Sequence, residues 1–123
     1  MKRFVKSLGH AFDGIRSALK TERNLRIHLL LSLVAVAIGI YTGITAVTWS
    51  LVIFAIGFVI ASELFNTAVE RLGDEAADGK ENQTVKAAKD VAAAGVLVSA
   101  LTAFVMGLLI LIVPFINKLI DLS

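Results

Sequence analysis

Hydrophobic residues along this chain gather in three long segments separated by polar stretches. The segments cover about residues 28–46, 48–70 and 88–113. A helix needs about 20 mostly apolar residues to cross a bilayer; the third segment has them, and the first two reach this length with flanking residues. Backbone groups inside a bilayer must be hydrogen-bonded internally, and three short segments cannot close a barrel. The pattern therefore predicts three transmembrane helices.

A different pattern precedes the first span, within residues 1–26. Apolar side chains recur there every three or four residues and form one stripe on a helix: Phe4, Leu8, Phe12, Ile15 and Leu19. Basic side chains lie mostly away from this stripe, as in a helix that lies in the membrane surface. A helix packed against protein would carry the same stripe. The expected fold is a single all-α membrane domain over residues 1–123, with a surface helix followed by three spans.

Composition agrees with a small integral membrane domain. Of the 123 residues, 57% are hydrophobic and 18% are charged, whereas soluble domains carry about 25% charged residues. The absence of cysteine excludes disulfides and thiolate metal sites. A net charge of +2 is too small to suggest a nucleic-acid partner. The first 26 residues are charged throughout, so no cleavable signal peptide is predicted.

Lysine and arginine are distributed unevenly between the two ends of the spans. Seven of the twelve precede Leu29, four lie within residues 71–90, and the loop at 41–50 has none. Because positive residues remain in the cytoplasm, the N-terminus and the second loop are predicted to be cytoplasmic. The polar ends of all three spans would then meet on that side of the membrane.

Glu63, Asn66 and Glu70 follow one another at intervals of three and four residues, which places them on one face of the second span. Ionisable residues at this depth usually mark function, although Glu63 alone could also cap the bilayer boundary. The link at 21–28 and the start of the third span bring further polar residues to the same layer: Glu22, Asn24, Arg26, Lys89 and Asp90. Carboxylates for Mg²⁺, a lysine for phosphate and a carboxylate base are the components of a phosphoryl-transfer site. For a basic residue taken alone, a headgroup contact or a topology signal is the simpler interpretation.

Residues 73–81 imitate a phosphate-binding loop, with Gly73, Gly79 and Lys80 in sequence. Five residues separate the glycines where the motif has four, and Glu81 replaces Ser or Thr. This segment is therefore not a P-loop, although Lys80 could still contact phosphate.

The third span carries four small residues at four-residue intervals: Gly95, Ser99, Ala103 and Gly107. Such a stripe lets transmembrane helices approach closely, and chance in an Ala- and Gly-rich helix is an equal alternative.

Three stretches resemble the prokaryotic diacylglycerol kinase family. The stretch "ELFNTAVERLGD" matches the family signature at Glu63, Asn66, Thr67, Ala68, Val69, Glu70 and Asp74, and Gly73 stands where Val is usual. The stretch "AAKDVAAAGVLV" is similar to the second family block, with Lys89 and Asp90 in place. The stretch "RFVKSLGHAFDGIRSALKTERNLRIH" resembles the N-terminal helix and its link to the first span. The resemblance covers most of the chain.

The resemblance implies a homotrimer in the bacterial inner (plasma) membrane, with active sites shared between subunits at the cytoplasmic face. Such a site phosphorylates a lipid alcohol with MgATP. Glu63 would be the general base, in contact with the lipid together with Asn66, and Glu22 and Glu70 would bind Mg²⁺. Asn66, Lys89 and Asp90 would complete the catalytic set. The implied nucleotide-binding residues are Arg3, His10, Glu22, Glu70, Lys80, Lys89 and Asp90.

The residues of the stretches "TERNLRIH" and "SELFNTAVE" look more like those of the Gram-positive branch of the family, whose members act chiefly on undecaprenol. Phosphorylation of undecaprenol is therefore favoured over phosphorylation of diacylglycerol. A small proton-coupled transporter could also use a membrane glutamate, but three spans with polar groups on one side argue against alternating access. A non-catalytic assembly subunit would explain the small-residue stripe but not Glu22, Glu63 and Glu70 together.

Overall fold

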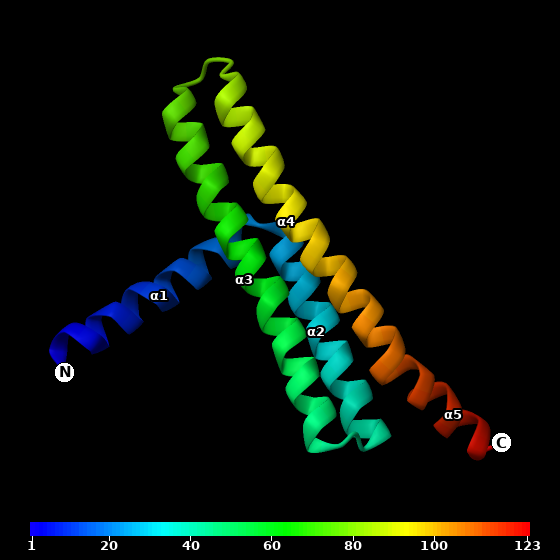
Figure 1. The fold of residues 1–123 in the computed structure, drawn as a ribbon. Helices are drawn as coiled ribbons and strands as arrows, with labels where there is room; N and C mark the ends of the chain where they lie inside the picture. Colours follow the sequence, from blue (N-terminus) through cyan, green and yellow to red (C-terminus); the bar gives the residue numbers. More distant parts are fainter.

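The computed structural model describes all of residues 1–123 as helices joined by short turns (Figure 1). The helices are α1 (Lys2–Thr21), α2 (Arg23–Thr42), α3 (Ala46–Ala77) and α4 (Gln83–Gly107), and α4 continues through the π-helical turn η1 (Leu108–Ile112) into α5 (Val113–Asp121). There is no strand. The predicted all-α fold is confirmed.

Three helical segments are long and apolar enough to cross a membrane: α2, α3 and the continuous stretch Gln83–Asp121. In the most apolar stretch of each segment, between 11% and 17% of the residues are buried, so most of the apolar side chains point outward. An apolar exterior of this kind requires a nonpolar surrounding. The chain is therefore a multi-pass membrane protein, with the three spans that the hydrophobic pattern predicts.

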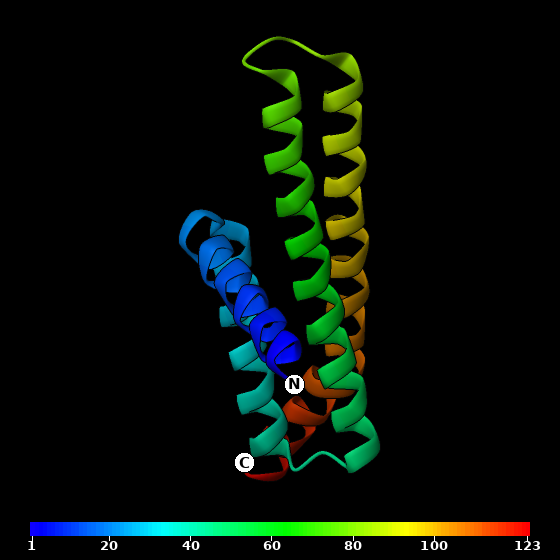
Figure 2. The same ribbon diagram turned by 90° about the vertical axis from the view of Figure 1, so that its left-hand side faces the viewer.

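Helices α3 and α4 form a long antiparallel pair, and α2 packs beside only part of its length (Figures 1 and 2). The α3–α4 pair extends past the start of α2 and ends in the turn at 78–82. The turn between α2 and α3 and the C-terminus lie at the opposite end of the molecule.

Helix α1 projects sideways from the start of α2 and leaves its apolar stripe uncovered (Figure 1). Phe4 is 65% exposed and Phe12 is 68% exposed, and Ala18 is the one buried residue of the helix. The chain itself therefore provides no partner for this stripe, which stays available to the membrane surface or to another subunit.

The first helix is shorter than the predicted 1–26, because Glu22 has an extended backbone (φ −100°, ψ 107°) that separates α1 from α2. The joint is fixed by Arg26, whose guanidinium donates hydrogen bonds to the carbonyl oxygens of Leu19 (2.7 Å) and Lys20 (3.1 Å). These carbonyls lie in the last turn of α1, where they have no partner within the helix.

The first span was expected to reach residue 46, but α2 ends at Thr42. Gly43 adopts the left-handed conformation (φ 69°) that commonly ends a helix. Thr45 then starts α3 as its N-cap, because its hydroxyl accepts a hydrogen bond from the amide of Thr48 (3.2 Å).

The third span is not a uniform α-helix, because it is interrupted by η1, which ends two residues before Pro114. Proline has no amide hydrogen and its ring crowds the carbonyl four residues earlier. A single π-helical turn is a common accommodation within a continuing helix. The hydrophobic pattern of this segment contains no sign of it.

Gly39 is needed where α2 packs against the start of α3. A Cβ at this position would lie 2.8 Å from Trp49 Cη2 and 3.1 Å from Ile44 Cδ1. We expect Gly39→Ala to lower the free energy of unfolding by about 1–3 kcal/mol, the usual cost of overpacking, measured by thermal unfolding in detergent. Gly57→Ala is the matched control, because no atom would lie within 4 Å of the added Cβ. Equal stability of the two variants would contradict the close approach at Gly39.

Candidate active site

Glu63 is the most deeply buried ionisable residue of the chain, with 2% of its surface exposed. It lies on the inner face of α3 with Val52, Val59 and Thr67, which are also buried. Its carboxylate oxygen Oε1 lies 3.2 Å from Nε2 of His28 on α2. The distance suits an ion pair, although Oε1 has no aligned hydrogen-bond donor. The buried face of α3 thus holds a carboxylate beside a single potential cation.

His28 carried no role in the sequence-based prediction, although it ends the quoted stretch "TERNLRIH". Its ionisable side chain near the start of an apolar helix could have indicated a functional role. Its pairing with Glu63 could not be anticipated, because the register between α2 and α3 is set by their packing.

A second polar cluster joins α3 to α4, where Lys89 forms an ion pair with Glu70 (3.4 Å) and contacts the carboxylate of Asp74. Gly73 makes room for it: a Cβ there would lie 3.0 Å from Lys89 Cε and 3.0 Å from Val85 Cγ1. A valine at this position would require the side chains of Lys89 and Val85 to shift. The contact made by Asp74 was not predicted.

Glu22 approaches the same end of α3 through Thr21. The hydroxyl of Thr21 donates to Glu22 Oε1 (2.9 Å) and accepts from the guanidinium of Arg71 (3.0 Å). The joint between α1 and α2 therefore lies beside the residue that follows Glu70, as the predicted topology requires. The structure records no direct contact between the Glu22 and Glu70 carboxylates.

Glu22 and Glu70, the predicted pair of magnesium ligands, do not form a complete protein-only metal site. No group of three or more His, Cys, Asp or Glu side chains is placed to hold a metal ion. Mg²⁺ keeps several waters and needs only one or two carboxylates when phosphates supply further oxygens. Two carboxylates near the same end of α3, both held by neighbouring polar groups, are compatible with that mode of binding.

An open pocket of about 480 Å³ lies at the far end of the α3–α4 pair, and the turn at 78–82 forms part of its wall. Three of its lining residues are lysines: Lys80, Lys86 and Lys89. Asp74 and Glu81 also line it. Lys80 thus lies near Lys89, and the pocket offers several cations to an anionic ligand.

The remaining predicted residues lie apart from Glu63. Asp90 pairs with Lys86 (3.0 Å) in a largely exposed contact along one face of α4. Arg3 and His10 are exposed on α1, which projects away from the α3–α4 pair (Figure 1). One chain therefore does not bring these three residues to Glu63.

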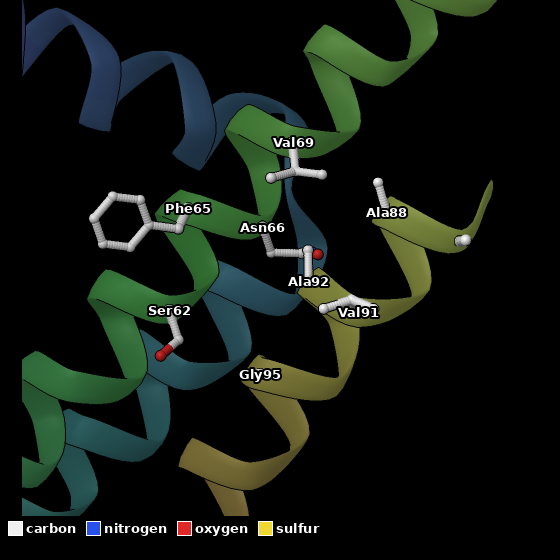
Figure 3. A pocket seen from close by; sticks show the side chains of 9 residues that line it. Ser62, Phe65, Asn66, Val69, Ala88, Val91, Ala92 and Gly95 are labelled. Atoms are coloured by element: carbon white, nitrogen blue, oxygen red, sulfur yellow. The ribbon is translucent and has the colours of Figure 1, made fainter. Parts of the chain in front are cut away.

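Asn66 lines a different site, an apolar pocket of about 620 Å³ between α3 and α4 (Figure 3). Phe65 and Val69 line it from α3, and Val91 and Gly95 line it from α4. The side chain of Asn66 points from α3 towards α4, and its Oδ1 is buried without a hydrogen-bond partner. A buried acceptor without a donor is costly, so the pocket suits an apolar ligand that carries a hydroxyl group.

The expected common face is therefore divided. The carboxylate of Glu63 faces α2, Asn66 faces the pocket between α3 and α4, and Glu70 pairs with Lys89 of α4. At 3.6 residues per turn the three positions fall within about 60° of one another, and packing of α3 against two different neighbours separates their side chains.

The small-residue stripe of the third span faces largely into the chain itself. Ser99 is fully buried, and Ala103 and Gly107 line an apolar cavity of about 380 Å³ between α2, α3 and α4. The stripe therefore provides close packing within one subunit, at least at these positions. It does not by itself indicate an oligomer.

Comparison with known proteins places the chain among membrane kinases. The model of the family described as "Prokaryotic diacylglycerol kinase" matches residues 9–111. The undecaprenol kinase of Bacillus subtilis (strain 168) is 36% identical over 110 residues, which cover 89% of this chain and 89% of that protein. The diacylglycerol kinase of Escherichia coli (strain K12) is 30% identical over 104 residues, which cover 84% of each chain.

Proposed function

Because this chain belongs to the prokaryotic diacylglycerol kinase family, a family of lipid kinases, we propose that it phosphorylates undecaprenol to undecaprenyl phosphate with ATP. Family membership sets aside the transporter and the non-catalytic subunit. The observation that carries the proposal is the order of groups along α3: a buried carboxylate at Glu63, an unpartnered amide oxygen at Asn66 and a lysine–carboxylate cluster at Glu70.

In the proposed reaction, the apolar chain of the lipid follows α3 and the pocket shown in Figure 3, and its hydroxyl lies between Asn66 of that subunit and Glu63 of a neighbouring subunit. The carboxylate of Glu63 takes the hydroxyl proton while the lipid oxygen bonds to the γ-phosphorus. The bond from this phosphorus to the β–γ bridging oxygen breaks, and ADP leaves. Asn66 orients the hydroxyl by donating an amide N–H to the lipid oxygen, because the single hydroxyl proton goes to Glu63.

The nucleotide would lie towards the lysine pocket at the end of the α3–α4 pair. Lys89 exchanges its carboxylate partners for phosphate oxygens, and Lys80 adds positive charge from the neighbouring turn. Glu22 and Glu70 would hold a magnesium ion, which when bound neutralises charge on the phosphates. These groups, like the N-terminus, would lie on the cytoplasmic side, where ATP is available and where the basic loops are expected.

We further propose a homotrimer with shared sites. Within one chain, Glu63 lines neither the lysine pocket nor the Asn66 pocket, and Arg3, His10 and Asp90 lie apart from it. A neighbouring subunit can supply these groups, and the uncovered apolar stripe of α1 offers a surface for such contact.

We propose undecaprenol as the substrate in preference to diacylglycerol, because the chain is 36% identical to the Bacillus undecaprenol kinase and 30% identical to the Escherichia diacylglycerol kinase. The purified protein in nanodiscs should release ADP from MgATP when undecaprenol is present, and more slowly with diacylglycerol. Release that is independent of both lipids would contradict lipid phosphorylation. A faster reaction with diacylglycerol would instead reverse the choice of substrate.

Glu22→Ala and Glu70→Ala should each raise the Mg²⁺ concentration required for half-maximal activity, by about tenfold. Each variant removes a hard oxygen ligand from the proposed magnesium site. The measurement is a magnesium titration at fixed ATP. Glu75→Ala is the matched control, since Glu75 is exposed on the same helix and has no proposed ligand role. An unchanged magnesium requirement in both variants would rule out this pair of ligands.

A further inference from the structure

We propose that His28 is a positioning residue for the carboxylate of Glu63. The inference rests on the proposed function, because it assigns His28 a task in the same phosphoryl transfer. The two residues come from different helices, and their side chains meet with Nε2 of His28 3.2 Å from Oε1 of Glu63.

The contact is made to one carboxylate oxygen. With a proton on Nε2, the imidazole attracts Oε1 and fixes the rotation of the carboxylate about its terminal bond. The other oxygen, Oε2, then remains free to accept the proton of a substrate hydroxyl. A base that is itself held by a third group is a recurring arrangement in proton-transfer sites.

No other cationic side chain is recorded in contact with this carboxylate. Lys89 is engaged by Glu70 and Asp74, and the guanidinium of Arg26 is engaged by the two carbonyl groups at the end of α1. A carboxylate that is 2% exposed needs a favourable partner. His28 is the one residue placed to provide it.

Helix packing holds the imidazole in place. Ser32, one turn further along α2, donates its hydroxyl to the backbone carbonyl of His28 (2.7 Å), a bond within the helix that does not involve the imidazole. His28 and Ser32 both line the apolar cavity between α2, α3 and α4. Because α2 packs beside α3 at this level (Figure 1), the distance between His28 and Glu63 is set by the helix pair.

The test compares His28→Gln with His28→Asn in the full-length protein in nanodiscs. Both variants place a neutral amide at residue 28, but only glutamine is long enough to place an N–H donor where Nε2 lies. We expect His28→Asn to lower kcat about 10-fold or more, because small misplacements of a reacting group are costly. His28→Gln should stay within about threefold of the wild-type kcat. KM for ATP should stay within about twofold in both variants, because the nucleotide site lies elsewhere.

Two further measurements separate positioning from a structural role. Ser32→Ala, a polar deletion on the same helix and cavity, should keep wild-type kcat. In a Glu63→Gln background, the His28→Asn and His28→Gln variants should show equal residual turnover, because the group on which His28 acts is absent.

Several results would overturn the inference. They are wild-type or raised kcat in His28→Asn, equal losses in the Asn and Gln variants, a loss confined to KM for ATP, or a loss of the same size in the Glu63→Gln background. A wild-type protein that phosphorylates no lipid alcohol would instead refute the proposed function, and it would be recognised before any variant is compared.

Discussion

Glu63→Gln should lower turnover by about 10²-fold or more while the protein remains folded and binds nucleotide. Glutamine has nearly the shape of glutamate, so the buried face of α3 keeps its packing, but an amide cannot accept the hydroxyl proton. The lysine cluster that is proposed to meet the phosphates lies further along α3 and retains its partners. The measurement is ADP release with saturating lipid alcohol and MgATP, together with nucleotide binding to the same preparation.

The matched control for this substitution is Glu75→Gln, the same chemical change at an exposed position of the same helix. It should retain wild-type turnover. Near-normal turnover in a correctly assembled Glu63→Gln protein would remove Glu63 from the role of general base. Loss of nucleotide binding in that variant would indicate that Glu63 acts on the nucleotide and not on the lipid.

Mixing two inactive variants, Glu63→Gln and Lys89→Ala, should restore activity by more than tenfold over either variant alone. If a site takes Glu63 from one subunit and Lys89 from its neighbour, random co-assembly leaves about one quarter of the sites with both residues intact. The structure supports this expectation because the carboxylate of Glu63 does not line the lysine pocket of its own chain. Activity is measured after the two variants are mixed as unfolded chains and refolded together.

Two controls make the mixing result specific. Glu63→Gln mixed with itself should stay inactive, and co-purification through different affinity tags should show that the variants share oligomers. Co-assembly without recovered activity would place Glu63 and Lys89 of one site on the same chain. Full activity in a subunit shown to be monomeric under assay conditions would refute the shared site altogether.

The helices could be predicted from the sequence because the spans are long apolar segments and the first helix carries an apolar stripe. A bilayer also permits few structures other than helices. Their ends were predicted less well. The break between α1 and α2 depends on the extended backbone of Glu22 and on Arg26, which bonds back to the end of α1. The end of α2 depends on Gly43, a cap residue that hydrophobicity alone does not reveal. Pro114 was visible, but the π-helical turn that accommodates it was not.

The candidate site was predictable as a list of residues and not as an arrangement. Spacing placed Glu63, Asn66 and Glu70 on one stripe of α3, whereas the neighbours α2 and α4 determine which way each side chain faces. The pairing of His28 with Glu63 joins residues 35 positions apart. Contacts of this kind depend on the relative register of two helices, which no local pattern in either helix specifies.

The length of α2 connects the proposed chemistry to the thickness of the surrounding bilayer. Its 20 residues rise about 30 Å at 1.5 Å per residue, close to the thickness of a typical hydrocarbon core. Because α2 ends sharply at Glu22 and Gly43, it has little spare length with which to absorb hydrophobic mismatch. A thicker bilayer would therefore have to thin locally around α2 or draw its first turns inward. His28 lies in these turns, so the depth of its contact with Glu63 depends on the thickness of the surrounding lipid.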